Sequence, residues 1–218
     1  MVTNIGKKVG LAGVVICYSL MALSAETSLE QSAYDLRSSS PQVRAAATEY
    51  LKTQHSSAAN DILLAAMAEE RNPGLRARLI EALDVNASSA AFSAAADAVF
   101  DKNPHVAQSA VIALGGGSDS ARVTAVLEKV IMGKSVPEQV KQGAVNALGF
   151  HSSTDSVRIL DYVAANTGNP EDMRQLAVQS MGRIGTKDAA ARIKKYRNDK
   201  SKKVSGTAKK AAAIKTKK

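Results

Sequence analysis

Five prolines recur along the chain at nearly constant intervals, and this regularity limits the fold more than any other feature of the sequence. They are Pro41, Pro73, Pro104, Pro137 and Pro170, and they stand 32, 31, 33 and 33 residues apart. A fixed period of roughly 20 to 50 residues is typical of repeat architectures, in which similar units stack side by side. The spacing therefore predicts an array of repeats.

The segments that follow the prolines share one apolar pattern. An apolar residue comes just after each proline, and further apolar residues stand four and eight positions later. This spacing places all three on one face of a helix. The aligned residues are Val43, Leu75, Val106, Val140 and Met173, then Ala47, Leu79, Ala110, Ala144 and Ala177, then Leu51, Leu83, Leu114, Leu148 and Met181.

The residues around these helices predict where each one starts and stops. A proline in the first turn costs no hydrogen bond, and its fixed φ suits a helix. Asparagine before a helix is a natural N-cap, and glycine after the last turn is a common helix terminator. The expected caps are Asn72, Asn103 and Asn169, and the expected terminators are Gly115, Gly149 and Gly182.

A short amphipathic helix is expected before each of these segments, so that the helices come in pairs. A further helix at 186–196 has no expected partner and closes the array. The fold class predicted is all-α, a solenoid of about five helix pairs plus a closing helix. The expected partner helices lie at 28–37, 61–70, 91–100, 121–132 and 157–165, and similar apolar spacing continues over 189–196.

The run of proline, apolar residue, basic residue and then A-x-x-A-L-G resembles HEAT repeats, especially the short bacterial repeats of the phycobilisome-lyase type. The resemblance covers residues 28–199. It implies a curved right-handed solenoid whose second helices line the concave face. Because this family includes scaffolds, adaptors, lyases and other enzymes, the resemblance specifies the fold and leaves the function open.

Residues 1–25 have the layout of a secretory signal peptide. Lys7 and Lys8 precede an apolar run over 9–23, and the small residues Ser24 and Ala25 follow it. A retained inner-membrane anchor is the alternative, although the run is shorter than the roughly 20 apolar residues of a span. Lipid modification of Cys17 is a third possibility, which the bulky Ile16 disfavours. We expect export to the periplasm or beyond, and a cysteine-free mature chain.

Positive charge is concentrated at the C-terminal end. The formal net charge of the chain is +9, yet residues 192–218 alone hold twelve basic side chains against one acid. Residues 200–218 are therefore predicted to be a disordered tail that attracts polyanions. A tail that only improves solubility is the other reading. The tail lysines are Lys200, Lys202, Lys203, Lys209, Lys210, Lys215, Lys217 and Lys218.

A basic residue follows the aligned apolar residue in four of the five repeats, at Arg44, Arg76, Lys141 and Arg174, and Ala107 breaks the series. This series has two interpretations. It is either a ladder of positive charge for an anionic partner, or a set of structural ion pairs between repeats. The structural interpretation is favoured, and the candidate partners are Asp61, Asp101 and Asp172.

The sequence contains no recognisable catalytic, metal or cofactor motif, so a non-enzymatic protein without a cofactor is expected. The histidines His55, His105 and His151 are far apart and lack metal-ligand spacing. The run Gly115–Gly117 follows a predicted helix, where a turn is expected, and it does not follow a strand as a phosphate loop does.

The predicted function is an exported scaffold that binds a protein partner through its concave face, while the tail contacts an anionic envelope polymer or lipid. A cytoplasmic nucleic-acid-binding protein is the alternative if the chain is not exported. Polar residues on the second helices are the candidate contacts. They are Glu49, Arg78, Gln108, Gln142, Asn146 and Gln179.

Overall fold

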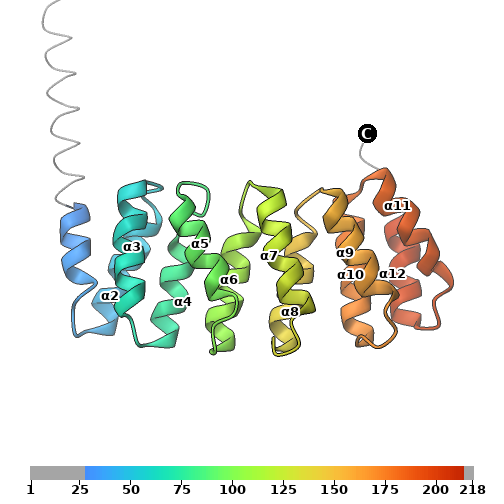
Figure 1. Cartoon of the computed structure of the whole chain (residues 1–218), viewed down its shortest axis with the longest axis horizontal. Coiled ribbons are helices and arrows are strands. Elements are labelled where there is room, and N and C mark those ends of the chain that lie inside the picture. Colours follow the sequence, from blue (N-terminus) through green and yellow to red (C-terminus); the bar gives the residue numbers. More distant parts are fainter. Residues whose placement is uncertain (1–27, 214–218) are drawn as a thin grey trace, which may run out of the picture.

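A computed structural model describes residues 28–213 of the chain, and all regular secondary structure in that range is helical. The predicted signal segment 1–25 and the lysines beyond residue 213 lie outside the described residues. The helices stand side by side in one row, from the N-terminal end in blue to the C-terminal end in red (Figure 1). They form two layers, because each pair contributes one helix to each layer.

The first helices of the pairs form one layer and the second helices form the other. The first helices are 28–35, α3 (Ser57–Glu69), α5 (Ser89–Ala98), α7 (Ser120–Met132), α9 (Thr154–Ala165) and α11 (Lys187–Ile193), which continues into the 3₁₀ helix η1 (Lys194–Asn198). The second helices are α2 (Pro41–Lys52), α4 (Pro73–Ala82), α6 (Pro104–Gly115), α8 (Glu138–Leu148), α10 (Glu171–Ile184) and α12 (Lys202–Ala213).

The prolines start the second helices in two different ways. In α2, α4 and α6 the proline is the first helical residue, and the preceding side chain caps the helix. Asn72 and Asn103 are two of these caps, as predicted. In α8 and α10 the proline itself is the N-cap residue. The predicted cap Asn169 is therefore wrong, and its amide instead donates to the Val163 carbonyl oxygen at 2.9 Å.

The aligned apolar residues form the core between the two layers. All of them are buried except Val43, which lies in the terminal repeat and is 38% exposed. Consecutive second helices contact each other along the whole row, and these contacts are more extensive than those between consecutive first helices. The second-helix layer is therefore the more closely packed of the two.

Two of the predicted helix terminators act mainly as close-packing positions. A Cβ atom added to Gly115 would lie 3.3 Å from the Ala147 Cβ, and one added to Gly182 would lie 2.9 Å from the Ala211 Cβ. α10 continues through Gly182 and ends at Gly185, whose φ of 67° is the left-handed conformation that glycine adopts easily. The prediction that this helix ends at Gly182 is wrong. The missing side chain of Gly182 instead lets α12 pack closely against α10.

The prediction of a disordered tail from residue 200 is wrong for residues 202–213. These residues form α12, which packs on α10 and makes a sixth pair with α11 and η1. Val204 and Ala208 are fully buried four positions apart, like the first two aligned residues of the other second helices. The high lysine content concealed this pattern, since the lysines occupy the exposed side of the helix.

Polar contacts also attach the sixth pair to the fifth. The Tyr196 hydroxyl donates to Asp161 Oδ1 at 2.6 Å, and Arg192 Nη1 lies 2.8 Å from Asp161 Oδ2. Burial alone would raise the pKa of Asp161, but the hydrogen bonds from Tyr196, Arg192 and Lys195 outweigh it and hold this pKa below its ordinary value. Burial and the bond to Asp161 raise the pKa of Tyr196.

Replacing Val204 by Asp should destabilise the sixth pair by about 3 kcal/mol, because it places an unpaired charge in the core. Melting monitored by circular dichroism should show a lower melting temperature. Amide hydrogen exchange should show faster exchange in α12. The matched control is Lys209→Asp, an exposed position on the same helix. Equal melts for the two variants would contradict the packing of α12.

Candidate interaction surface

The six predicted contact residues all lie on second helices. We call the surface formed by the exposed side chains of α2, α4, α6, α8, α10 and α12 the second-helix face. Of the six residues, Glu49, Arg78 and Gln179 are exposed, whereas Gln108, Gln142 and Asn146 are partly buried. The structure thus spreads them over five consecutive helices along one face and does not gather them in a single cavity.

Several of these side chains contact the neighbouring repeat. Arg78 Nη1 lies 3.9 Å from Glu49 Oε1, and both side chains are more than half exposed. Asn146 accepts hydrogen bonds from Arg183 Nη1 through its side-chain and main-chain oxygens, each at 3.1 Å. Gln108 packs over Gly143, where any Cβ would lie 2.5 Å from its Nε2. Asn146 and Gln108 therefore also support the packing of repeats.

The N-terminal part of the second-helix face is hollowed. A cleft of about 720 Å³ is lined by residues of α2, α4 and the start of α6. Its charged side chains are Glu49, Glu81 and Arg78. Ser109 donates a hydrogen bond to Glu81 Oε1 at 2.5 Å. We call this cleft the acidic hollow, because it holds two carboxylates against one guanidinium group.

Sequence reasoning did not select several exposed residues of the same face. Ile112 is 58% exposed on α6, and Phe150, just after α8, is 63% exposed. The Arg183 guanidinium lies over the Phe150 ring at 4.4 Å from its centroid. Glu81 and Ile112 stand six residues after the aligned apolar residue, as Glu49, Asn146 and Gln179 do. Extending the alignment to this position would have found them.

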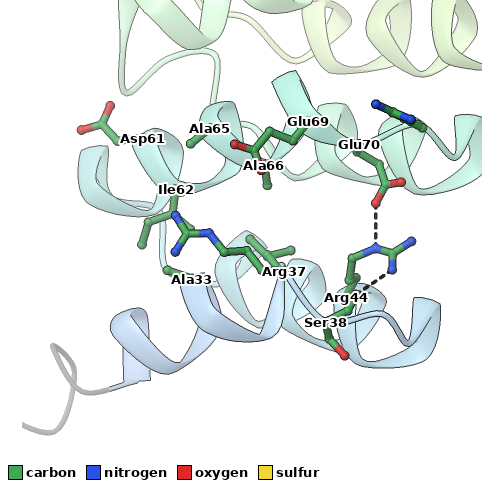
Figure 2. Close-up of a pocket in the computed structure, with 12 residues that line it drawn as sticks. Ala33, Arg37, Ser38, Arg44, Asp61, Ile62, Ala65, Ala66, Glu69 and Glu70 are labelled. Atoms are coloured by element: carbon green, nitrogen blue, oxygen red, sulfur yellow. Dashed lines mark hydrogen bonds and ion pairs between the residues drawn. The ribbon is translucent and has the colours of Figure 1, made fainter.

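The recurrent arginines form ion pairs between repeats. Arg44 Nε lies 2.8 Å from Glu70 Oε2, and Figure 2 shows this pair beside the Arg44 bond to the Ser38 carbonyl. Arg76 Nη2 bonds both oxygens of Asp101, at 2.9 and 3.1 Å. Arg174 pairs with Asp199 and also donates to the Ala164 carbonyl at 2.8 Å. The structural interpretation is confirmed for these three arginines.

The acid of each pair also accepts a hydrogen bond from the main chain just before the next second helix. Glu70 accepts from the Asn72 main-chain N–H at 2.8 Å, and Asp101 accepts from that of Asn103 at 2.7 Å. Asp199 accepts from the Ser201 N–H at 2.9 Å. Burial would raise the pKa of Asp199, but the bonds from Arg174 and Ser201 outweigh it and lower the pKa. The acid thus links one repeat to the helix start of the next.

The acidic partners lie about 25 residues after their arginines, in the turns between first and second helices. Of the predicted partners, only Asp101 is correct. Asp61 is exposed on α3, and Asp172 pairs with Lys203 at 2.7 Å. The two repeats without an arginine at this position also lack an acid about 25 residues later. Residue 25 after Ala107 is Met132, and residue 25 after Lys141 is Asn166.

Figure 2 shows a second cleft, of about 590 Å³, between helix 28–35 and α3. Its apolar lining includes Leu36, Ile62 and Ala66, and the Arg44–Glu70 pair lies at one side. It belongs to the first-helix side of the array, and none of the six predicted contact residues lines it.

The lysines of the predicted tail are divided by the structure. Lys200 lies in the turn before α12, and Lys202, Lys203, Lys209 and Lys210 are exposed on α12. Hydrogen bonding to Asp172 raises the pKa of Lys203. Lys215, Lys217 and Lys218 lie outside the described residues. The described basic side chains are therefore displayed on a packed helix.

Within residues 28–213, no group of three or more His, Cys, Asp or Glu side chains has the geometry to hold a metal ion. None of the helices described is long and apolar enough to cross a membrane. His151 is buried, with Nδ1 3.3 Å from Ser120 Oγ and no partner for Nε2 among the described residues. Burial lowers the pKa of His151, although a bond with the Gly115 main chain acts in the opposite direction.

Two stacked layers of paired helices, with contacts running from each pair to the next, define an α-solenoid repeat protein. Residues 60–149 match the family model of HEAT repeats. This segment therefore matches HEAT repeats, the family that the sequence motif resembles, and the helix pairs on either side of it continue the same solenoid. A search of curated proteins finds no match.

Solved structures share the architecture at low sequence identity. A designed armadillo repeat protein, YIII(Dq.V1)4CPAF in complex with the peptide (KR)4, has a TM-score of 0.56 and 16% identity, over 84% of this chain and 97% of that one. The CpcE–CpcF complex of phycocyanin lyase from Nostoc sp. PCC7120 has a TM-score of 0.46 and 20% identity, over 84% and 86%. Human deoxyhypusine hydroxylase has 0.41 and 14%, over 88% and 97%. At these identities the likeness concerns the fold alone.

A double-mutant cycle of Arg76→Gln and Asp101→Asn should give a coupling energy of about 1 kcal/mol, since both side chains are only 20% exposed. The exposed pair Arg78 and Glu49 is the matched control, with the same substitution types and an expected coupling near zero. Urea denaturation measures both. Equal coupling in the two cycles would remove the structural role of the Arg76 pair.

His151 should make the fold less stable as the pH falls from about 7 to about 5. Because its pKa is lowered on folding, the unfolded chain binds the proton more strongly. The stabilisation is complete above the ordinary pKa and is lost as the pH falls below it. Melting temperatures across this range should vary less for His151→Gln than for the exposed control His105→Gln. The same pH dependence in both variants would refute the assignment.

Proposed function

We propose that this chain is a non-enzymatic, exported HEAT-repeat scaffold that binds a protein partner through its second-helix face. The observation that carries the proposal is the division of its polar groups. The recurrent arginines are paired inside the array, while the amide and charged side chains of the second-helix face are spread over consecutive helices. A row of shallow contacts suits a long macromolecular surface better than a small substrate.

The charge of the array supports a second contact at its C-terminal end. Residues 28–186 hold fourteen basic and seventeen acidic side chains, whereas residues 187–213 hold ten basic and two acidic ones. The sixth pair is therefore a basic end on an acidic body. An anionic envelope polymer or lipid is the partner proposed for this end, since long-range attraction to polyanions needs such a concentration of charge.

The same architecture is able to hold a peptide. The designed armadillo repeat protein that shares this fold forms a complex with the peptide (KR)4. That complex belongs to the designed protein, and it supports a peptide or protein as the kind of partner that a solenoid accommodates. The HEAT resemblance favours the same class of function and says nothing about the partner's identity.

Site-specific photo-crosslinking in the native cell tests the proposal. A photoreactive amino acid at Gln142 or Gln179, on the second-helix face, should yield one discrete adduct with another protein. The control positions are Lys129 and Tyr162, which are exposed on the first helices α7 and α9. If only the control positions gave adducts, the partner would bind the first helices, and the proposed binding face would be contradicted.

The mass of the protein purified from the native cell tests whether it is exported. Loss of about 25 N-terminal residues is expected for a cleaved signal peptide. A retained Met1 would contradict cleavage, and recovery of that full-length form in the cytosol with bound nucleic acid would favour the alternative function.

A further inference from the structure

One position of the repeat changes character in order along the array. It is the residue six places after the aligned apolar residue, where α12 is aligned on the buried Val204. From α2 to α12 this position holds Glu49, Glu81, Ile112, Asn146, Gln179 and Lys210. All six lie on the second-helix face, and all are exposed except Asn146, which is partly buried. The series runs from acidic through apolar and amide to basic.

The acidic end of the series coincides with the acidic hollow. Glu49 and Glu81 line it together, and Arg78 lies 3.9 Å from Glu49, so one carboxylate is not balanced by an ion pair there. The remaining lining is neutral or small, including Gln42, Ala45 and Gly74. A cationic side chain is the complementary group for such a cleft.

Further along the second-helix face, after the acidic hollow, come two exposed apolar side chains. Arg183 of α10 contacts Asn146 of α8, and Ile112 and Phe150 occupy the same pair of positions one repeat earlier. Ile112 and Phe150 therefore hold aligned positions on consecutive repeats, and both are more than half exposed. Two large apolar side chains exposed together, with polar side chains around them, are typical of a binding contact.

The basic end carries charge that no acid balances. Within the described residues, neither Arg183 nor Lys210 forms an ion pair; Arg183 instead stacks on Phe150 and bonds Asn146. The second-helix face therefore has an acidic end, an apolar centre and a basic end. A nucleic acid would meet unfavourable carboxylates at the first of these, so a peptide of matching polarity fits the face better.

We propose that the second-helix face binds an extended peptide segment with a basic side chain, then a large apolar one, then an acidic one. The proposal deepens the proposed function and rests on it. Neighbouring helices lie about 8–10 Å apart, so the three contacts are separated by roughly 20 Å each. An extended chain covers this distance in about six residues. The expected motif is thus a basic, an apolar and an acidic residue at intervals of about six.

Selection of a displayed library of random 18-residue peptides on the full chain tests this motif. Enriched peptides are then synthesised with a fluorescent label, and their affinities are measured by anisotropy. The double substitution Glu49→Lys/Glu81→Lys should weaken binding of the enriched peptides about tenfold or more. A peptide whose basic residue is replaced by Glu should bind this variant better than it binds the unmodified chain.

Two further variants keep the test specific. Asp61→Lys/Asp97→Lys makes the same change of charge on the exposed side of the first helices α3 and α5, and it should alter affinity by less than about twofold. Glu49→Gln/Glu81→Gln removes the charge with little change of shape. It should also weaken binding, which separates the loss of carboxylates from any unfolding caused by lysine.

The outcomes distinguish the motif from the proposed function. Enriched peptides without a basic and an apolar residue at this spacing, or with affinities unchanged by Glu49→Lys/Glu81→Lys, overturn the motif. If those peptides compete with the crosslinked partner, the proposed function stands. Enrichment of no peptide at all overturns the motif, and absence of a crosslinked partner as well overturns the proposed function.

Discussion

Close approach of neighbouring second helices is the constraint on which the rest of the molecule depends. Where α6 meets α8 and α10 meets α12, Gly115 and Gly182 face the alanines Ala147 and Ala211. A Cβ on Gly182 would be too near to Ala211, and one on Gly115 would make a tight contact with Ala147. Small residues let the two backbones come together, and the contact between helices then buries the aligned apolar residues. Because each repeat rests on the next in this way, the polar residues that face outward are held in register along the row. The candidate contacts are thus ordered along the face, and two of them, Glu49 and Arg78, line the acidic hollow.

Most of the fold could be predicted from the sequence, since each second helix carries its own start signal and apolar spacing. The sixth pair escaped because α12 has no proline and has alanine, Ala212, where its predecessors have leucine or methionine. Its lysines resemble those of a disordered segment, and only the burial of Val204 and Ala208 against α10 overrides that composition. Tertiary packing determines the structure of α12, and the local sequence pattern does not reveal that packing.

The candidate surface could be predicted only in part. That the arginines are structural followed from their recurrence, yet their partners Glu70 and Asp199 were missed. The reason is geometric, because those acids stand in turns of the following repeat and not on a helix face. The apolar pair of Ile112 and Phe150 was also missed, since exposed apolar residues in a helical pattern are indistinguishable from core until burial is known. The acidic hollow could not be predicted, because it forms only where three helices lie side by side.

The distribution of the arginine–carboxylate pairs has a mechanical consequence. A linear array of repeats has two terminal units, each supported by a single neighbour, and thermal opening starts from such units. The pairs join the first repeat to the second, the second to the third and the fifth to the sixth. Of the five junctions, the third and the fourth have Ala107 with Met132 and Lys141 with Asn166 instead. Both terminal repeats are thus tied to their single neighbour by a recurrent ion pair at the place where fraying begins, whereas the fourth and fifth repeats are joined by the more exposed Arg158–Glu128 pair between α9 and α7.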